Sequence, residues 1–104
     1  MVLVYLRDTV TLKQRARLAE QIATMPEVQE FAFVSKRLAL LRLLMRLGIL
    51  VWPRSNPVPA SFEIVVKARS DVLPVARRFF TNPLVDNDPG THDGVWFAHY
   101  PTSP

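Results

Sequence analysis

The chain has 104 residues, with 13 basic and 9 acidic side chains, a formal net charge of +4 and no cysteine. This length fits a single domain, and the absence of cysteine excludes disulfides and thiolate metal sites. The positive charge favours an anionic neighbour, such as a membrane surface, a cell-wall polymer or nucleic acid, but it also fits ordinary solubility. No apolar run reaches the roughly 18–20 residues of a membrane-spanning helix.

The first 35 residues are predicted to form a strand, a helix and a second strand. Residues 2–7 are an apolar, β-rich run that suits a central strand. Residues 12–24 have the pattern of an amphipathic helix, for which Thr11 is one candidate N-cap. Residues 28–35 form the second predicted strand. The helix face predicted to point inward carries Leu12, Ala16, Ala19, Ile22 and Ala23.

The next segment is more apolar than a small domain can bury on one side. Ser35 is a suitable N-cap and Gly48 a suitable C-terminal stop, which predicts a helix over about residues 36–47. Arg42 and Arg46, one turn apart, form its polar stripe, and leucines and a methionine cover most of the remaining circumference. A surface helix normally has a single apolar face. We therefore expect a partner protein, a second copy or a lipid surface to cover the remainder.

The second half of the chain contains a clear strand, a helix and a final strand. The alternation of residues 60–68 predicts a strand with Phe62, Ile64 and Val66 on one face. Residues 70–81 are predicted to be a helix, followed by turn-rich residues and a last strand over 95–100.

This order of elements predicts an α+β fold, the ferredoxin-like split βαβ sandwich. Four antiparallel strands would carry two helices on one face. The apolar helix would be an insertion between strands two and three. We expect one domain over residues 1–104, with a core formed by about 2–35 and 60–100 and a helical lobe over about 36–59.

The sequence offers little support for catalysis, metal binding or a cofactor. His92 and His99 lack the spacing of metal ligands, and the scattered glycines cannot form a phosphate-binding loop. Residues 86–93 contain several oxygen ligands, but Thr91 stands where a calcium loop requires glycine. We therefore expect no catalytic residue, no metal and no cofactor.

Nucleic acid is a possible partner by topology, because RNA-binding domains of this topology stack bases on an open sheet face. Tyr5, Trp96 and Tyr100 could lie on that face. However, the aromatic and glycine signature of those domains is absent, and several arginines gather around the inserted segment instead. The sequence therefore argues against nucleic acid.

Two segments resemble the permease-like cell-division protein FtsX. Residues 33–36 (Phe-Val-Ser-Lys), followed by Ala39 and Leu40, are similar to its (Tyr/Phe)-Val-Ser-Lys-x-x-Ala-Leu element. Residues 56–64 (Asn-Pro-Val-Pro-Ala-Ser-Phe-Glu-Ile) are similar to its Asn-Pro-Leu-Pro-x-Ser-Phe-Glu-Val element. The resemblance covers residues 2 to about 80 and lies within the family's large extracytoplasmic loop.

The resemblance implies a domain on the extracytoplasmic face of a bacterial membrane, in a protein that pairs with a cytoplasmic ATPase. It implies that the domain binds the coiled coil of a peptidoglycan hydrolase, or of a hydrolase activator, and that ATP cycling switches cell-wall cleavage at division. It also implies that the lobe contacts this partner. The candidate contact residues are Leu40, Leu43, Leu44, Leu47, Ile49, Leu50 and Trp52.

The residues alone leave three other interpretations of the lobe open. The whole inserted segment could simply thicken the core of the domain. Arginines beside leucines are also typical of a helix that lies in a membrane interface. Alternatively, the lobe could be a dimer interface between two copies of this chain. An enzymatic function has little support from the residues.

Overall fold

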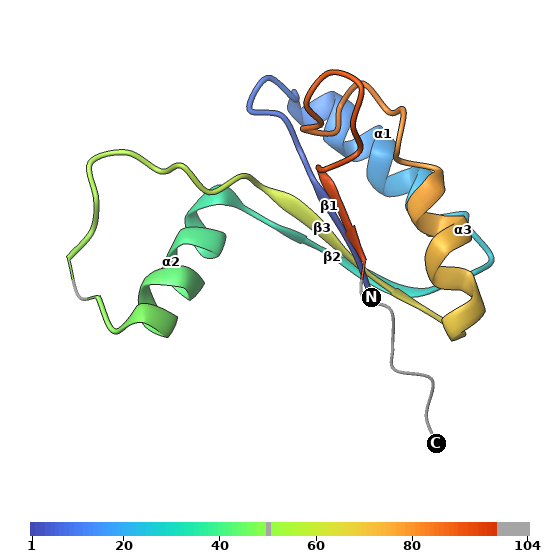
Figure 1. The fold of residues 1–104 in the computed structure, drawn as a ribbon, viewed down its shortest axis with the longest axis horizontal. Coiled ribbons are helices and arrows are strands. Elements are labelled where there is room, and N and C mark those ends of the chain that lie inside the picture. The colour runs from blue at the N-terminus through green and yellow to red at the C-terminus, as the bar shows by residue number, and fades with distance from the viewer. Residues whose placement is uncertain (50, 98–104) are drawn as a thin grey trace.

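The structure is a computed structural model, and it describes residues 1–49 and 51–97. Four antiparallel strands form one sheet in the order β2-β3-β1-β4 (Figure 1). This is the predicted ferredoxin-like α+β arrangement. The last strand was predicted to reach residue 100, but residues 98–100 lie outside the described residues. The strands are β1 (Val2–Tyr5), β2 (Val28–Val34), β3 (Ser61–Val66) and β4 (Val95–Phe97).

Two helices cover one face of the sheet, as predicted (Figure 1). They are α1 (Leu12–Ala23) and α3 (Val72–Arg77), and the short 3-10 turn η1 (Arg69–Asp71) precedes α3. The predicted helix over 70–81 is therefore too long. After α3 the backbone tightens into hydrogen bonds to the third preceding residue, such as Phe79 N to Ala76 O. This turn still buries Phe79.

The core lies between this sheet face and the two helices. Its centre is Phe62, whose ring centroid is 6.1 Å from that of Phe31 and 5.5 Å from that of Phe33. The buried core residues are Val2, Val4, Leu6, Leu18, Ile22, Phe62, Ile64, Val66, Val72, Val75, Ala76, Phe79, Val85 and Val95.

The predicted inward face of α1 is confirmed for Ile22, which is buried, and for Ala19, which packs against the core, but not for its other three residues. Leu18 and Ile22 point into the core, whereas Leu12, Ala16 and Ala23 are exposed. Leu12 lies roughly 100° around the helix from the stripe that Leu18 and Ile22 share. The buried stripe is therefore centred on Leu18 and Ile22, with Ala19 packed beside it, and residue 12 lies outside the core.

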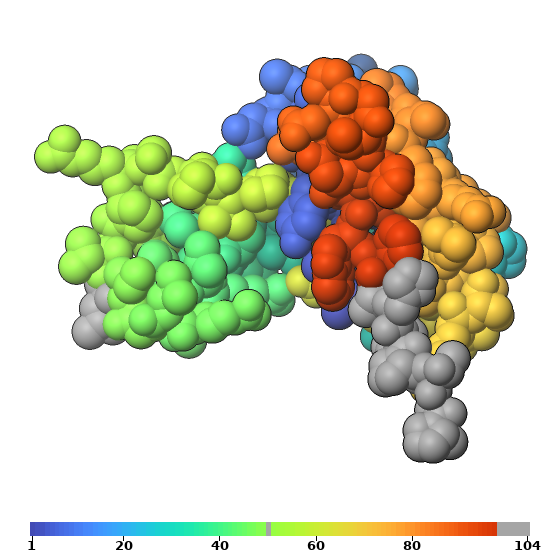
Figure 2. Space-filling view, in the orientation of Figure 1, coloured from blue at the N-terminus to red at the C-terminus, as the bar shows by residue number. Residues whose placement is uncertain are grey.

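Helix α2 (Lys36–Leu47) follows β2 directly and projects away from the sheet, and the chain then returns to β3 (Figure 1). Its ends agree with the prediction. Ser35 Oγ accepts a hydrogen bond from Leu38 N at 3.1 Å, and Gly48 adopts a left-handed φ of 70°. We call residues 36–59 the lobe; residue 50 lies outside the described part. In the space-filling view the lobe protrudes to one side of the molecule (Figure 2).

Candidate protein-binding surface

Helix α2 buries only a narrow stripe of its surface. Leu40 and Leu44, one turn apart, are 2% and 9% exposed. Asn56 Nδ2 donates a 2.7 Å hydrogen bond to Lys36 O, which ties the returning segment to the first turn of α2. Most of the remaining circumference is open to solvent. The exposed large apolar side chains of the lobe are Leu38, Leu41, Leu43, Met45, Leu47, Ile49, Val51 and Trp52.

The structure describes six of the seven predicted contact residues and divides these six into an exposed and a buried group. Four of them are exposed, namely Leu43, Leu47, Ile49 and Trp52. Leu40 and Leu44 are buried within the lobe and offer little surface to a partner in this arrangement, and their contact with a partner stays a prediction. The remaining predicted residue, Leu50, lies outside the described residues.

An exposed apolar ridge on the outer side of α2 was not among the predicted contacts. Leu38, Leu41 and Met45 have the spacing i, i+3 and i+7, which places them on one helix face. All three are exposed. This spacing was readable from the sequence, but the side of α2 that the lobe buries was not.

The lobe and the open face of the sheet enclose a groove of about 460 Å³. On the sheet side, Leu3 pairs with Trp96 in the strand register, so both project from the face that α1 and α3 leave uncovered. Opposite them, α2 presents Arg42, Leu43 and Arg46. We call this cavity the groove. Its lining residues are Leu3, Tyr5, Val34, Ala39, Arg42, Leu43, Arg46, Val58, Ser61, Glu63 and Trp96.

The excess positive charge of the chain is concentrated on the lobe. The lobe holds five of the 13 basic side chains and none of the 9 acidic ones, so the rest of the chain is close to neutral. Arg42 Nη1 lies 2.7 Å from Glu63 Oε1, and the Arg37 guanidinium lies 5.7 Å from the ring centroid of Trp52. The basic residues of the lobe are Lys36, Arg37, Arg42, Arg46 and Arg54.

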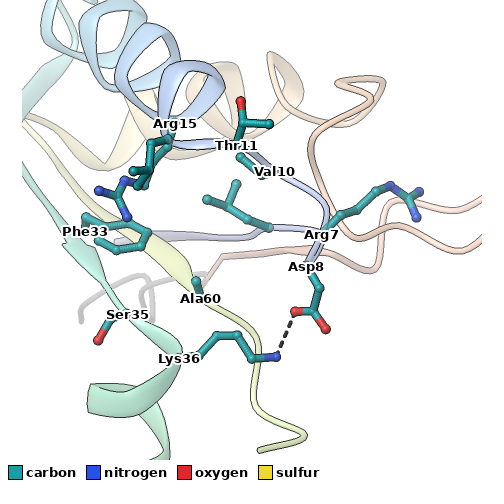
Figure 3. A pocket seen from close by; sticks show the side chains of 11 residues that line it. Arg7, Asp8, Val10, Thr11, Arg15, Phe33, Ser35, Lys36 and Ala60 are labelled. Atoms are coloured by element: carbon teal, nitrogen blue, oxygen red, sulfur yellow. Dashed lines mark hydrogen bonds and ion pairs between the residues drawn. The ribbon is translucent and has the colours of Figure 1, made fainter.

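A second cavity, of about 230 Å³, is lined by the segment that joins β1 to α1, by the first turn of α1 and by the junction of β2 with α2 (Figure 3). Its cationic groups already have partners. Lys36 Nζ lies 2.7 Å from Asp8 Oδ1, and the Arg15 guanidinium lies 4.2 Å from the centroid of the Phe33 ring. Arg7 donates to Asn87 O at 2.7 Å. These contacts fix the cavity walls and leave little free charge for a ligand.

Hydrogen bonds within the loop of residues 86–93 occupy an oxygen atom of Asp93 that a calcium ion would need. Asp93 Oδ1 accepts hydrogen bonds from Asp88 N at 2.8 Å and from Thr91 Oγ1 at 2.7 Å. The bond from Thr91 lowers the pKa of Asp93, while the hydrogen bond and the charge of Asp93 raise the pKa of Asp88. The described part of the chain contains no group of three His, Asp or Glu residues that could hold a metal ion. His92 stacks on Phe80, with centroids 4.1 Å apart.

No helix within residues 1–49 and 51–97 is both long enough and apolar enough to span a bilayer. Tyr5 and Trp96 share the open sheet face, as the sequence predicts, whereas Tyr100 and His99 lie outside the described residues. The register pairs Tyr5 with Ser61 and Trp96 with Leu3. The two aromatic side chains therefore line the groove beside α2.

A family model described as the FtsX extracellular domain matches residues 1–87. The chain belongs to the FtsX extracellular domain family. This finding confirms the resemblance seen in the sequence. The FtsX extracellular domain is a non-catalytic part of a permease-like, membrane-bound cell-division protein, and it lies on the extracytoplasmic side of the membrane. Membership of this family also implies interaction with a protein partner in the division complex.

A solved structure of the same family has a similar fold. It is the crystal structure of extracellular domain 1 (ECD1) of FtsX from S. pneumoniae in complex with undecyl-maltoside. The two chains share 18% sequence identity with a TM-score of 0.72, over 92% of this chain and 91% of that chain. Because the identity is low, this likeness shows the fold alone. Among curated proteins, no sequence matches this chain.

Proposed function

We propose that this FtsX extracellular domain binds the coiled coil of a peptidoglycan hydrolase, or of a hydrolase activator, through the exposed apolar surface of its lobe. Binding would recruit the hydrolase to the division complex and regulate cell-wall cleavage. The cytoplasmic ATPase that pairs with the full-length protein would act on this interaction indirectly. The exposure of apolar side chains on one protruding segment is the observation that carries this proposal.

The chemistry of the lobe suits a coiled-coil partner. A coiled coil that is not fully paired offers an apolar stripe along one face. Exposed leucines and a tryptophan are effective anchors for such a stripe, because buried aromatic and apolar side chains supply much of the energy of interfaces. Trp52 is 50% exposed and Leu47 is 59% exposed, so both can lose apolar surface to water on binding.

A calorimetric titration with purified coiled-coil regions of hydrolases or activators from the same genome tests this proposal. We expect the double variant Leu47→Gln/Trp52→Gln to bind more than about tenfold more weakly than the native domain. These two substitutions remove apolar contact surface without changing the charge of the domain. Leu12→Gln is the matched control, because Leu12 is 72% exposed on α1, outside the lobe. Equal binding by the native domain and the folded double variant would refute the lobe as the contact surface.

A membrane-surface function is the second candidate. The FtsX domain from S. pneumoniae was crystallised in complex with undecyl-maltoside, an alkyl detergent, and the lobe of this chain combines basic residues with an exposed tryptophan. Co-sedimentation with vesicles of phosphatidylglycerol would support this candidate if it is lost in the same double variant. Self-association predicts instead that the elution volume in size-exclusion chromatography depends on the protein concentration.

A further inference from the structure

A third cavity, of about 620 Å³, is formed by the segment that joins α3 to β4, with Arg7, just after β1, as a further wall. This segment lies at the top of Figure 1, away from α2 and from the surface proposed to bind a protein partner. The volume is within the range of sites that bind small molecules. An occupant of this cavity would therefore not compete with a partner on the lobe.

One wall of the cavity is a stack of two rings. The ring of His92 lies on that of Phe80, with centroids 4.1 Å apart and an interplanar angle of 13°. Phe80 is half-buried and its centroid lies 6.2 Å from that of Phe97 in β4, whereas His92 is exposed. The core therefore anchors the stack, and the stack offers flat ring surface to the cavity. Such a surface suits a ligand that has an apolar face.

Hydrogen bonds from side chains to the backbone hold the cavity in one shape. Arg7 donates to Pro83 O at 3.2 Å and to Asn87 O at 2.7 Å. Asn87 Nδ2 donates to Phe80 O at 3.0 Å, and Asn87 Oδ1 accepts from Gly94 N at 2.7 Å. Asn87 therefore joins the turn after α3 to the start of β4. A ligand would meet a site that is already formed, which lowers the entropic cost of binding.

Polar groups without partners remain on the cavity walls. Asn82 Oδ1 accepts a 2.9 Å hydrogen bond from Leu84 N, so Asn82 Nδ2 is left as a donor. Neither Asn82 Nδ2 nor Thr81 Oγ1 forms a hydrogen bond within residues 1–49 and 51–97. Asp88 also lines the cavity and is exposed, and its carboxylate supplies acceptors. The cavity therefore presents an amide donor, a hydroxyl and a carboxylate beside the ring stack.

The charges around the cavity argue against an anionic ligand. Asp86, Asp88 and Asp93 all lie in the short segment before β4. Arg7 lines the cavity, but its Nη1 lies 3.8 Å from Asp86 Oδ1, so a carboxylate already opposes its charge. A negatively charged ligand would meet repulsion here, in contrast to the basic lobe. A neutral ligand that both donates and accepts hydrogen bonds fits this surface better.

We propose that this cavity binds a neutral sugar ring of a glycan. The apolar C–H face of the ring packs on the stacked rings of Phe80 and His92, and its hydroxyl groups pair with Asn82, Thr81 and Asp88. The domain lies on the extracytoplasmic side of the membrane, where the bacterial cell wall has a glycan backbone of N-acetylated aminosugars. This site is independent of the proposed function, because it lies outside the lobe.

A titration followed by the amide resonances of the isotope-labelled domain tests this inference. The probe is tri-N-acetylchitotriose, a neutral trimer of N-acetylglucosamine. We expect it to shift the amides of residues 80–82 and 90–92 and to leave those of α2 unchanged. Trigalacturonate, a trimer with a carboxylate on each ring, should bind about fivefold more weakly or less, because of the aspartates. Equal binding of the two trimers would overturn the inference of a neutral ligand.

Substitutions of His92 test the ring stack. His92→Ala should weaken binding of the chitotriose about fivefold, whereas His92→Phe, which keeps a flat ring, should bind like the native domain. Gln29→Ala is the matched control, because Gln29 is exposed on β2, away from the cavity. If the chitotriose shifted no amide of the cavity, or if the folded His92→Ala variant bound it as tightly as the native domain, the inference would be wrong.

The lobe variant separates this inference from the proposed function. Leu47→Gln/Trp52→Gln should lose the coiled coil but bind the chitotriose like the native domain, because the two surfaces are separate. If this variant also lost the chitotriose while it remained folded, the sugar would bind on the lobe and the cavity inference would be wrong. If no coiled coil bound the native domain but the chitotriose bound in the cavity, the cavity inference would stand and the proposed function would be wrong.

Discussion

Arg42 and Glu63 join the lobe to the open face of the sheet, with Arg42 Nη1 2.7 Å from Glu63 Oε1. Arg42 belongs to α2 and Glu63 to β3, and both line the groove. This ion pair therefore contributes to the angle at which α2 stands from the sheet. Its side chains are 53% and 31% exposed, so it is a pair partly screened by solvent.

Removing this pair should loosen the lobe more than it destabilises the domain. We expect Glu63→Ala to lower the free energy of unfolding by only about 0.2–1 kcal/mol, since exposed ion pairs contribute little. Amide hydrogen exchange in α2 should nevertheless become faster, because the lobe loses a link to β3. Glu30→Ala, at an exposed position of β2, is the control. Unchanged exchange in α2 would show that other contacts set the angle of the lobe.

Neighbouring leucines of α2 should respond very differently to truncation. Leu40 is 2% exposed and Leu41 is 43% exposed. Leu40→Ala should cost about 2–5 kcal/mol, because it removes buried surface and leaves a cavity. Leu41→Ala should change stability by less than about 0.5 kcal/mol. Urea unfolding measures the free energy of unfolding of each variant, and hydrogen exchange detects any separate opening of the lobe. If both variants lost a similar amount of stability, the lobe would not be packed around Leu40.

The end of α2 should depend on the left-handed backbone of Gly48. Its φ is 70°, and a Cβ atom placed there would meet no other atom within 4 Å. The cost of Gly48→Ala is therefore conformational strain rather than a clash, about 1 kcal/mol. Gly48→Asn should be milder, because asparagine tolerates this conformation better. Thermal unfolding of the two variants tests this order, and an alanine variant as stable as the native domain would contradict it.

The 86–93 loop should make stability depend on pH in two opposite ways. Asp93 has a pKa below its ordinary value of 3.8, so its contribution is present above pH 3.8 and is lost as the pH falls through the lowered pKa. Asp88 has a raised pKa, so its ionisation destabilises the folded state as the pH rises through that pKa. We expect Asp88→Asn to raise the melting temperature at pH 7 and to leave it nearly unchanged at pH 3. If Asp88→Asn melted at a lower temperature than the native domain at pH 7, the ionised Asp88 carboxylate would instead stabilise the folded state.

Much of the candidate site was predictable because local chemistry determines it. The caps at Ser35 and Gly48 set the ends of α2, and the excess of leucines between them predicted an exposed apolar surface. The motifs at residues 33–40 and 56–64 predicted the FtsX family. The sequence could not show which leucines the lobe buries, because a helix that is apolar nearly all round has no unique inner face. The predicted contacts therefore combine exposed leucines with Leu40 and Leu44, whose side chains the lobe buries.

The amino-acid sequence by itself determined the order of elements, the ends of α2 and the concentration of positive charge on the lobe, since these depend on residues close together in the chain. Only the tertiary structure decided the inner stripe of α1 and the pairing of Arg42 with Glu63. It also brought Trp96 opposite Leu43, from β4 and α2, far apart in the sequence. Such relationships follow from strand register and from the direction in which α2 leaves the sheet, and no local pattern specifies either.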